Sequence, residues 1–213
     1  MDAAKIVSKI SKEHGIIKNV YFLACGGSLV DLYPGYYFVR AESAVMDAQW
    51  IPAREFALTP PKKLGKDSLL IICSHSGKTK ECLEAAKVGM DAGAAVVTMT
   101  HAPGSPCDCE EWISVVYDWA PGVKEAQKPQ GIVLDILNEL MKAQEPGYTL
   151  YNSIKEGFEK IDDIIAEAVK KQQNSAWLFA EKYYEEPNLY IMASGASYSQ
   201  AYLSLIHISE PTR

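Results

Sequence analysis

Short runs of apolar residues alternate along the chain with segments in which apolar residues recur at helical spacing. Continuous apolar runs of this length are typical of strands buried on both faces, as in parallel sheets that are connected by helices. The expected strands are 19–25, 43–48, 68–73, 94–100 and 112–119, and the expected helices are 3–14, 28–40, 54–58, 80–92 and 132–142. This order predicts a flavodoxin-like three-layer α/β sandwich with a five-stranded parallel sheet over residues 1–145.

Composition and charge exclude several classes of protein. Of the 213 residues, 48% are hydrophobic and 23% are charged, a balance that excludes a disordered chain. The net charge is −6 and there is no basic block, so we expect no nucleic-acid partner. No apolar run approaches the ~20 residues of a membrane span, and the N-terminus does not resemble a signal peptide. We therefore expect a cytoplasmic protein without a membrane partner.

The cysteines give little sign of disulfides or of a metal site. Their number, five, is odd, which argues against a disulfide framework. Cys107 and Cys109 form a C-x-C pair, but a structural zinc site needs a second ligand pair, and only His101 stands nearby. We expect no metal and no cofactor.

The character of the sequence changes after residue 145. Residues 146–187 show helical periodicity and are expected to form a connector of two helices or one bent helix. Residues 188–203 then repeat an earlier pattern, because Tyr190–Ser197 matches Tyr21–Ser28 in the placement of its apolar run, glycine and serine. An internal repeat at this distance predicts the truncated start of a second copy of the first domain.

The last ten residues, 204–213, break the expected helix with a β-branched run and a proline. This string resembles a translated sequencing adapter, and our hypothesis is that it is not native sequence. The alternative is a genuine short C-terminal tail.

Two predicted strands end in loops suited to an anion. Gly26, Gly27 and Ser28 follow the first strand, and the third strand leads into Ser74, His75, Ser76, Gly77, Lys78 and Thr79. The carboxyl ends of parallel strands form the ligand crevice of an open α/β sheet, and helix N-termini there favour anions. The glycines permit close backbone approach, the hydroxyls add donors and Lys78 could add charge. These loops predict a phosphate site, although the serines could instead only cap the helices that follow.

The spacing of these residues indicates which kind of phosphate is bound. Neither the G-x-x-x-x-G-K-[ST] pattern of a P-loop nor the G-x-G-x-x-G pattern of a dinucleotide-binding fold is present. A hydroxyl-rich loop without these features favours a sugar phosphate over a nucleotide.

The loop Ser74–Thr79 resembles the Ser-X-Ser-Gly-X-Thr phosphate loop of SIS (sugar isomerase) domains, and Ala24–Ser28 resembles their first-strand loop. The resemblance runs from about residue 15 to 202 and is greatest to the deglycases of phosphorylated Amadori products, such as fructoselysine 6-phosphate deglycase, which contain two SIS domains. It implies that Ser28, Ser74, Ser76 and Thr79 hold the substrate phosphate and that His75 occupies a position often taken by Gln. Glu55 resembles a Glu of these deglycases and is a possible substrate contact.

The implied reaction converts a fructosamine 6-phosphate and water to glucose 6-phosphate and a free amine. In the family, a Glu and a His of the second domain, in a Gly-Glu-…-His-Gly-Pro stretch, supply the proton transfers. No such stretch occurs in these 213 residues, and His14 and His101 are interpreted as surface residues. The catalytic residues therefore stay unknown. Two alternatives remain: a non-catalytic phosphosugar-binding module, and a sugar-phosphate isomerase or the isomerase half of an amidotransferase. The resemblance also implies a homodimer.

Overall fold

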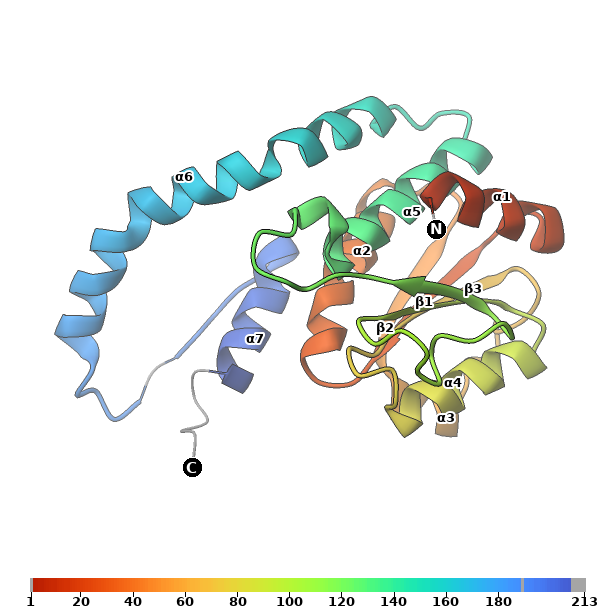
Figure 1. Ribbon diagram of the computed structural model, residues 1–213, viewed down its shortest axis with the longest axis horizontal. Helices are drawn as coiled ribbons and strands as arrows, with labels where there is room; N and C mark the ends of the chain where they lie inside the picture. Colours follow the sequence, from red (N-terminus) through yellow and green to blue (C-terminus); the bar gives the residue numbers. More distant parts are fainter. Residues whose placement is uncertain (1, 189, 208–213) are drawn as a thin grey trace.

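Five parallel strands form the centre of the fold in the order β2-β1-β3-β4-β5 (Figure 1). The structure is a computed structural model that describes residues 2–188 and 190–207, with side chains described through residue 203. The strands are β1 (Asn19–Ala24), β2 (Asp47–Pro52), β3 (Ser68–Cys73), β4 (Ala95–Thr100) and β5 (Ile113–Val116). The predicted parallel sheet is confirmed, and its strand order is that of flavodoxin-like folds.

Strands β1, β3 and β4 lie at the centre of the sheet because their residues are almost all apolar. Every residue of β1, β3 and β4 is buried, whereas β2 at one edge of the sheet alternates between exposed and partly buried positions. Asn19 pairs with Ser68 and Ala24 with Cys73, so β1 and β3 end level with each other. This register brings the loops that follow the two strands to the same edge of the sheet.

Helices cover both faces of the sheet (Figure 1). One face packs against α1 (Ala3–His14), α2 (Gly27–Glu42) and α5 (Pro129–Gln144) in a single core cluster. The other face packs against α3 (Ala53–Leu58) and α4 (Lys80–Asp91) in a second cluster. The result is the predicted three-layer sandwich.

Several predicted element boundaries are wrong, among them the end of the fifth strand, which lies at Val116 and not at residue 119. The second strand begins at Asp47 and not at Ser43, because Ser43 ends α2 as its C-cap. The hydroxyl of Ser43 donates to the buried carboxylate of Glu145 at 2.5 Å, which fixes this residue outside the sheet. Ser28 does not cap α2 either, because the helix begins at Gly27 with Gly26 as the N-cap.

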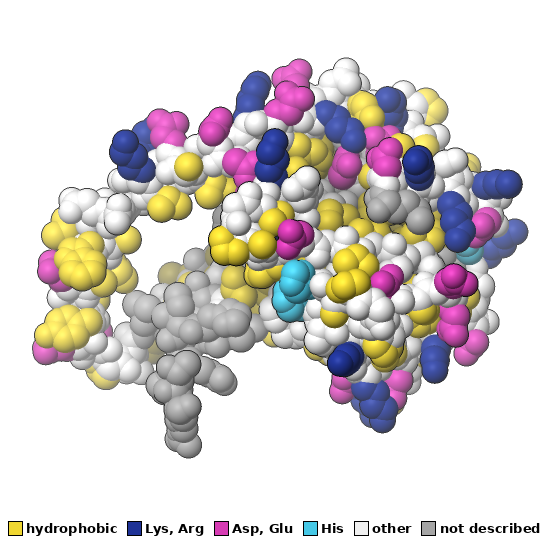
Figure 2. All heavy atoms as spheres, viewed as in Figure 1, with side chains coloured by type: hydrophobic (Ala, Val, Ile, Leu, Met, Phe, Trp, Pro, Cys, Tyr) yellow, Lys and Arg dark blue, Asp and Glu magenta, His cyan; other side chains and the backbone are white. Residues whose placement is uncertain are grey.

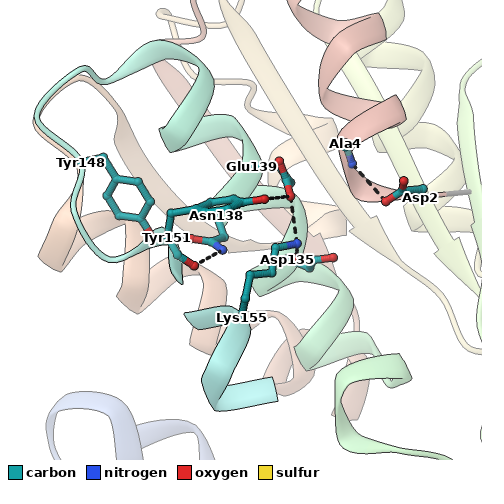
Figure 3. Close-up of polar contacts among 8 residues, drawn as sticks. All are labelled: Asp2, Ala4, Asp135, Asn138, Glu139, Tyr148, Tyr151 and Lys155. Carbon is teal, nitrogen blue, oxygen red and sulfur yellow. Dashed lines mark hydrogen bonds and ion pairs between the residues drawn. The ribbon is translucent and has the colours of Figure 1, made fainter. Parts of the chain in front are cut away.

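The connector is one helix, α6 (Tyr151–Tyr183), of 33 residues. Its first turns are held on α5 by Lys155, whose ammonium group lies 2.5 Å from Asp135 and 2.8 Å from Glu139 (Figure 3). The hydroxyl of Tyr151 also donates to Glu139 at 2.7 Å, and the amide of Asn138 donates to the Tyr151 carbonyl at 3.1 Å. These contacts fix the direction in which α6 leaves the sandwich.

The second half of α6 stands off from the sandwich (Figure 2). From Ile164 onward, α6 carries exposed apolar side chains, namely Ile164, Ile165, Val169, Trp177, Leu178 and Phe179. Across the described ranges, none of the helices combines the length and apolar character needed to cross a membrane.

The predicted strand within 189–193 does not form over the described residues 190–193. A strand needs a neighbour for its backbone N–H and C=O groups, and this run does not pair with the sheet. After it, a short 3₁₀ turn, η2 (Gly195–Ser197), leads into α7 (Tyr198–His207), which lies against α2. Tyr33 of α2 contacts the ring of Tyr198 and donates from its hydroxyl to the Gly195 carbonyl at 3.1 Å. Residues 204–207 of the proposed non-native tail continue α7, so they do not break the helix as predicted, and residues 208–213 lie outside the described residues.

Candidate functional site

The site predicted from the sequence lies at the carboxyl edge of the sheet, where β1 leads into α2 and β3 leads into α4. Gly26 adopts a φ of +59° before α2, and Thr79 is the N-cap of α4. Because β1 and β3 are neighbours in register, the first turns of these two helices lie at the ends of adjacent strands. Residues 26–28 and 74–79 are hereafter called the first loop and the second loop.

Both helix starts present unpaired backbone donors. In the part of the chain that the structure describes, the N–H groups of Gly27 and Ser28 in α2 and of Lys80 and Glu81 in α4 have no hydrogen-bond partner. Unpaired N–H groups and the partial positive charge of a helix N-terminus favour a bound anion. Two such helix starts side by side suit an anion with several oxygens, such as a phosphate.

Internal hydrogen bonds hold the second loop in shape. The buried Ser74 donates its N–H to the Met99 carbonyl at 3.0 Å and accepts at its own carbonyl from the Gly77 N–H at 2.9 Å. The hydroxyls of Ser74 and Thr79 lie 2.8 Å apart, and neither caps α4 through its first helical N–H groups. Ser74 therefore fixes the loop, and Ser76 lies exposed with its hydroxyl accepting from the Lys78 N–H at 3.3 Å.

Glycine is required at the centre of the second loop. Gly77 has a φ of +64°, in the left-handed region that other residues adopt only with strain. An added Cβ would lie 1.9 Å from the Ser105 hydroxyl and 2.7 Å from that of Thr100. The Gly77 carbonyl also accepts from the Cys107 N–H at 3.0 Å, so the segment after β4 supports the loop from behind.

Ser28 lies beside the end of β3, near the fully buried Cys73. Burial raises the pKa of the Cys73 thiol to about 12; the charge of Asp31 adds to the rise, and the hydroxyls of Tyr117 and Ser28 oppose it. Asp31, one turn along α2, is itself partly buried, and burial raises its pKa to about 6 although the Gln130 amide donates to it at 2.5 Å. Sequence reasoning missed this acidic group close to the first loop.

Glu55 lies on α3, which follows the carboxyl end of β2 at the same edge of the sheet. Its side chain is exposed, and its carbonyl accepts from the Thr59 N–H at 2.9 Å. The neighbouring Arg54 forms an ion pair with Glu84 of α4 at 2.8 Å, which ties α3 to the helix that begins at the second loop.

The structure adds an aromatic cluster to the site that sequence reasoning missed. His101, interpreted from the sequence as a surface residue, is partly buried, and its ring stacks on that of His75 with centroids 4.9 Å apart and planes 16° apart. Tyr117 and Trp119, which follow β5, contact the His75 ring at centroid distances of 5.9 and 5.8 Å. Burial and His101 together lower the pKa of His75. Figure 2 shows histidine side chains exposed beside hydrophobic ones near the middle of the face.

The signal that could have found this cluster is the sheet order. His101 follows β4 and Tyr117 follows β5, so both stand at the same carboxyl edge as the second loop. Their proximity to His75 depends on β4 lying beside β3. Over the described ranges, no group of three or more metal-ligating side chains is placed to hold an ion.

Comparisons with known proteins agree with this fold. No protein-family model matches the chain. It is 34% identical over 186 residues to the fructosamine deglycase FrlB of Bacillus subtilis, covering 87% of this chain and 56% of that protein. It is 27% identical over 210 residues to a glutamine–fructose-6-phosphate aminotransferase (isomerizing) of Clostridium tetani, covering 95% of this chain and 34% of that protein.

A solved structure extends the comparison to three dimensions. A crystal structure of a protein assigned as a phosphosugar isomerase, from Salmonella typhimurium LT2, superposes with a TM-score of 0.88 at 33% identity. The match covers 96% of this chain and 62% of that one, so the chain spans little more than half the length of this protein and of the Bacillus subtilis deglycase. The five-stranded parallel sheet, its strand order and these similarities show that the chain has the SIS fold of the phosphosugar isomerases.

Proposed function

We propose that this domain binds the phosphate of a phosphorylated sugar between the first loop and the second loop. The observation that carries the proposal is the pair of helix starts, α2 and α4, whose unpaired N–H groups stand at the ends of adjacent strands. The phosphate accepts from these N–H groups and from exposed or partly exposed hydroxyls of the two loops.

In this arrangement each loop residue has a distinct role. Gly26 and Gly27 let the ligand approach the backbone, and Ser28 and Ser76 offer hydroxyls. Ser74, Gly77 and Thr79 fix the shape of the second loop through the hydrogen bonds described above. His75 lies exposed at the rim, and Glu55, on the neighbouring α3, contacts the sugar portion.

We further propose that the protein is a deglycase of fructosamine 6-phosphates. The support is the 34% identity to a fructosamine deglycase, which exceeds the 27% identity to the aminotransferase. In the reaction the ketoamine isomerises to an aldimine by proton transfer between C1 and C2, and water then hydrolyses the aldimine. One water is consumed, and glucose 6-phosphate and the free amine are released.

The second candidate is the isomerase half of a glutamine–fructose-6-phosphate aminotransferase, which the similarity to the Clostridium tetani protein favours. The two activities share a sugar 6-phosphate and differ in the second substrate. A deglycase releases an amine from a fructosamine 6-phosphate, whereas the aminotransferase consumes glutamine and fructose 6-phosphate. Substrate choice therefore separates them.

The repeat at residues 190–197 supports a domain assignment of 1–145 for the first domain, 146–187 for the connector and 188–203 for the beginning of a second domain. Gly195 adopts a φ of +62°, like Gly26 at +59°, and each glycine precedes a helix. We propose this organisation within a cytoplasmic homodimer. Light scattering on the full-length gene product measures the subunit number, and a monomer would contradict the dimer.

Binding is tested first, by thermal shift with glucose 6-phosphate and with glucose. Glucose 6-phosphate should raise the melting temperature, glucose should not, and Ser74→Ala combined with Ser76→Ala should abolish the rise. Ser8→Ala is the matched control, because Ser8 is exposed on α1 and lies outside both loops. An unchanged rise in the double variant would exclude this site.

Activity is tested with the full-length gene product. Incubation with fructoselysine 6-phosphate should release glucose 6-phosphate and lysine in equal amounts. Glutamine-dependent conversion of fructose 6-phosphate without amine release from the Amadori compound would favour the second candidate. Failure to turn over any fructosamine 6-phosphate would refute the deglycase assignment.

A further inference from the structure

Tyr117 follows β5 and is hydrogen-bonded to residues at the ends of two other strands, β3 and β4. It is only 4% exposed, and its N–H donates to the Thr100 carbonyl at 2.9 Å. Its hydroxyl lies 3.0 Å from Nδ1 of His75 and 3.9 Å from Sγ of Cys73. Its own carbonyl lies 3.1 Å from Nδ1 of His101. One tyrosine thus contacts both stacked imidazoles.

The bond from His101 to a carbonyl has only one possible direction. A carbonyl oxygen accepts and never donates, so Nδ1 of His101 carries the proton and donates to Tyr117. In the neutral ring the other nitrogen, Nε2, is then a hydrogen-bond acceptor.

The Tyr117 hydroxyl has two possible acceptors, Nδ1 of His75 and Sγ of Cys73, and their relative strength gives the direction of its hydrogen bond to His75. Burial raises the pKa of the Tyr117 hydroxyl and of the Cys73 thiol, so both keep their protons at neutral pH. An imidazole nitrogen is a much stronger acceptor than a neutral thiol sulfur, so the Tyr117 proton goes to Nδ1 of His75. The thiol then donates to the tyrosine oxygen. His75 is thereby held with its proton on Nε2.

The two stacked rings therefore have opposite tautomers. His75 offers an Nε2–H donor, and His101, with its centroid 4.9 Å away, offers an Nε2 acceptor. Within the described residues, neither Nε2 atom has a hydrogen-bond partner. A sugar hydroxyl can donate and accept, so a donor beside an acceptor matches a polyhydroxylated ligand.

We propose that Tyr117 is a positioning residue that fixes the tautomers of His75 and His101, so that the pair recognises sugar hydroxyls next to the phosphate bound at the second loop. The recognition step rests on the proposed function, because the second loop must hold the phosphate. The tautomers themselves do not depend on any ligand.

The test is the nitrogen chemical shifts of the two imidazoles in the ¹⁵N-labelled chain at neutral pH. In the wild type, His75 should show the Nε2–H form and His101 the Nδ1–H form. Tyr117→Phe removes the hydroxyl and keeps the carbonyl, so His75 should become a mixture of tautomers while His101 stays unchanged. Tyr148→Phe is the control, because the hydroxyl of Tyr148 donates to the Asn138 side chain at 2.5 Å and not to a residue of the second loop. A wild-type His75 protonated on Nδ1, or a His101 that changes with His75, would overturn the proposal.

Binding supplies the second readout. Tyr117→Phe should weaken glucose 6-phosphate binding about fivefold, the effect of one misplaced hydrogen bond, and leave inorganic phosphate binding unchanged. Equal weakening for both ligands would mean that Tyr117 only maintains the second loop, against this proposal. If the wild type binds neither ligand, the proposed function and the recognition step both fail, whereas wild-type binding with the wrong tautomers rejects this inference alone.

Discussion

Replacement of Gly77 by alanine tests how tightly the second loop is built. The substitution adds one methyl group at a φ of +64°, 1.9 Å from the Ser105 hydroxyl, 2.5 Å from the Ser105 Cβ and 2.7 Å from the Thr100 hydroxyl. The left-handed backbone costs about 1–2 kcal/mol for a residue with a Cβ. Overpacking a filled space adds about 1–3 kcal/mol. Together these terms predict a loss of about 2–5 kcal/mol in the free energy of unfolding.

Two further variants separate the terms. Gly104→Ala has a similar φ of +69°, but its added Cβ would meet nothing within 4 Å, so it should show only the backbone term. Combining Gly77→Ala with Ser105→Gly removes both Ser105 atoms from the clash and leaves the Thr100 contact. The double variant should therefore recover part of the packing term relative to Ser105→Gly alone.

The assay is urea denaturation, in which midpoints are compared between variants whose free energy of unfolding depends on urea with the same slope. Glucose 6-phosphate binding is then measured on the folded variants. Gly77→Ala should unfold at lower urea than Gly104→Ala and bind glucose 6-phosphate more weakly, because the loop must move to fit the methyl group. Equal midpoints for the two alanine variants would refute the close approach of Ser105 to the loop.

Three other substitutions probe separate parts of the molecule. Ser105→Ala should leave stability equal or raise it by up to about 1 kcal/mol in urea denaturation, because the buried hydroxyl has no hydrogen-bond partner among the described residues; a loss above that size would show that the hydroxyl is bonded. Asp31 has its pKa raised to about 6, so its folded form holds a proton more tightly and stability falls as pH rises from about 4 to about 6. Asp31→Asn should therefore be more stable than wild type at pH 7.5, by up to about 3 kcal/mol, and lose this advantage below pH 4. Urea denaturation of both proteins at the two pH values measures the difference. A difference that does not change with pH would contradict the raised pKa of Asp31. Lys155→Met should speed hydrogen exchange in the first turns of α6 and lower the free energy of unfolding by about 1 kcal/mol, since it removes the ion-pair partner of Asp135 and Glu139 on α5. Lys160→Met is the control, because Lys160 pairs with Glu156 at 3.8 Å on the exposed side of α6. Equal exchange in both variants would count against the anchoring of α6 by Lys155.

The central strands were predictable because burial on both faces leaves a continuous apolar run, as in Leu69–Cys73. The second strand was misplaced because its run, Asp47–Pro52, alternates and lies at an edge. Its predicted start, Ser43, looked like a strand residue only because its bond to Glu145, 102 positions away, is invisible in the sequence.

The loops of the site were predictable for a different reason. Glycines and hydroxyl residues directly after buried strands are typical of anion-binding loops, so the sequence predicted a phosphate site at Gly26–Ser28 and Ser74–Thr79. His101 and Tyr117 did not, because their approach to His75 follows from strand order and side-chain stacking rather than from spacing. In the repeat, the φ of Gly195 (+62°) is close to that of Gly26 (+59°), whereas the apolar run before Gly195 forms no strand over the described residues 190–193.

The central claim is that a sugar phosphate binds at the paired starts of α2 and α4. The most direct test is an amide chemical-shift titration of the chain with glucose 6-phosphate, followed by the same titration with glucose. The account predicts large shifts for the N–H groups of Gly27, Ser28, Lys80 and Glu81 with glucose 6-phosphate and none with glucose. Shifts centred elsewhere on the sheet, or equal shifts with the unphosphorylated sugar, would contradict it.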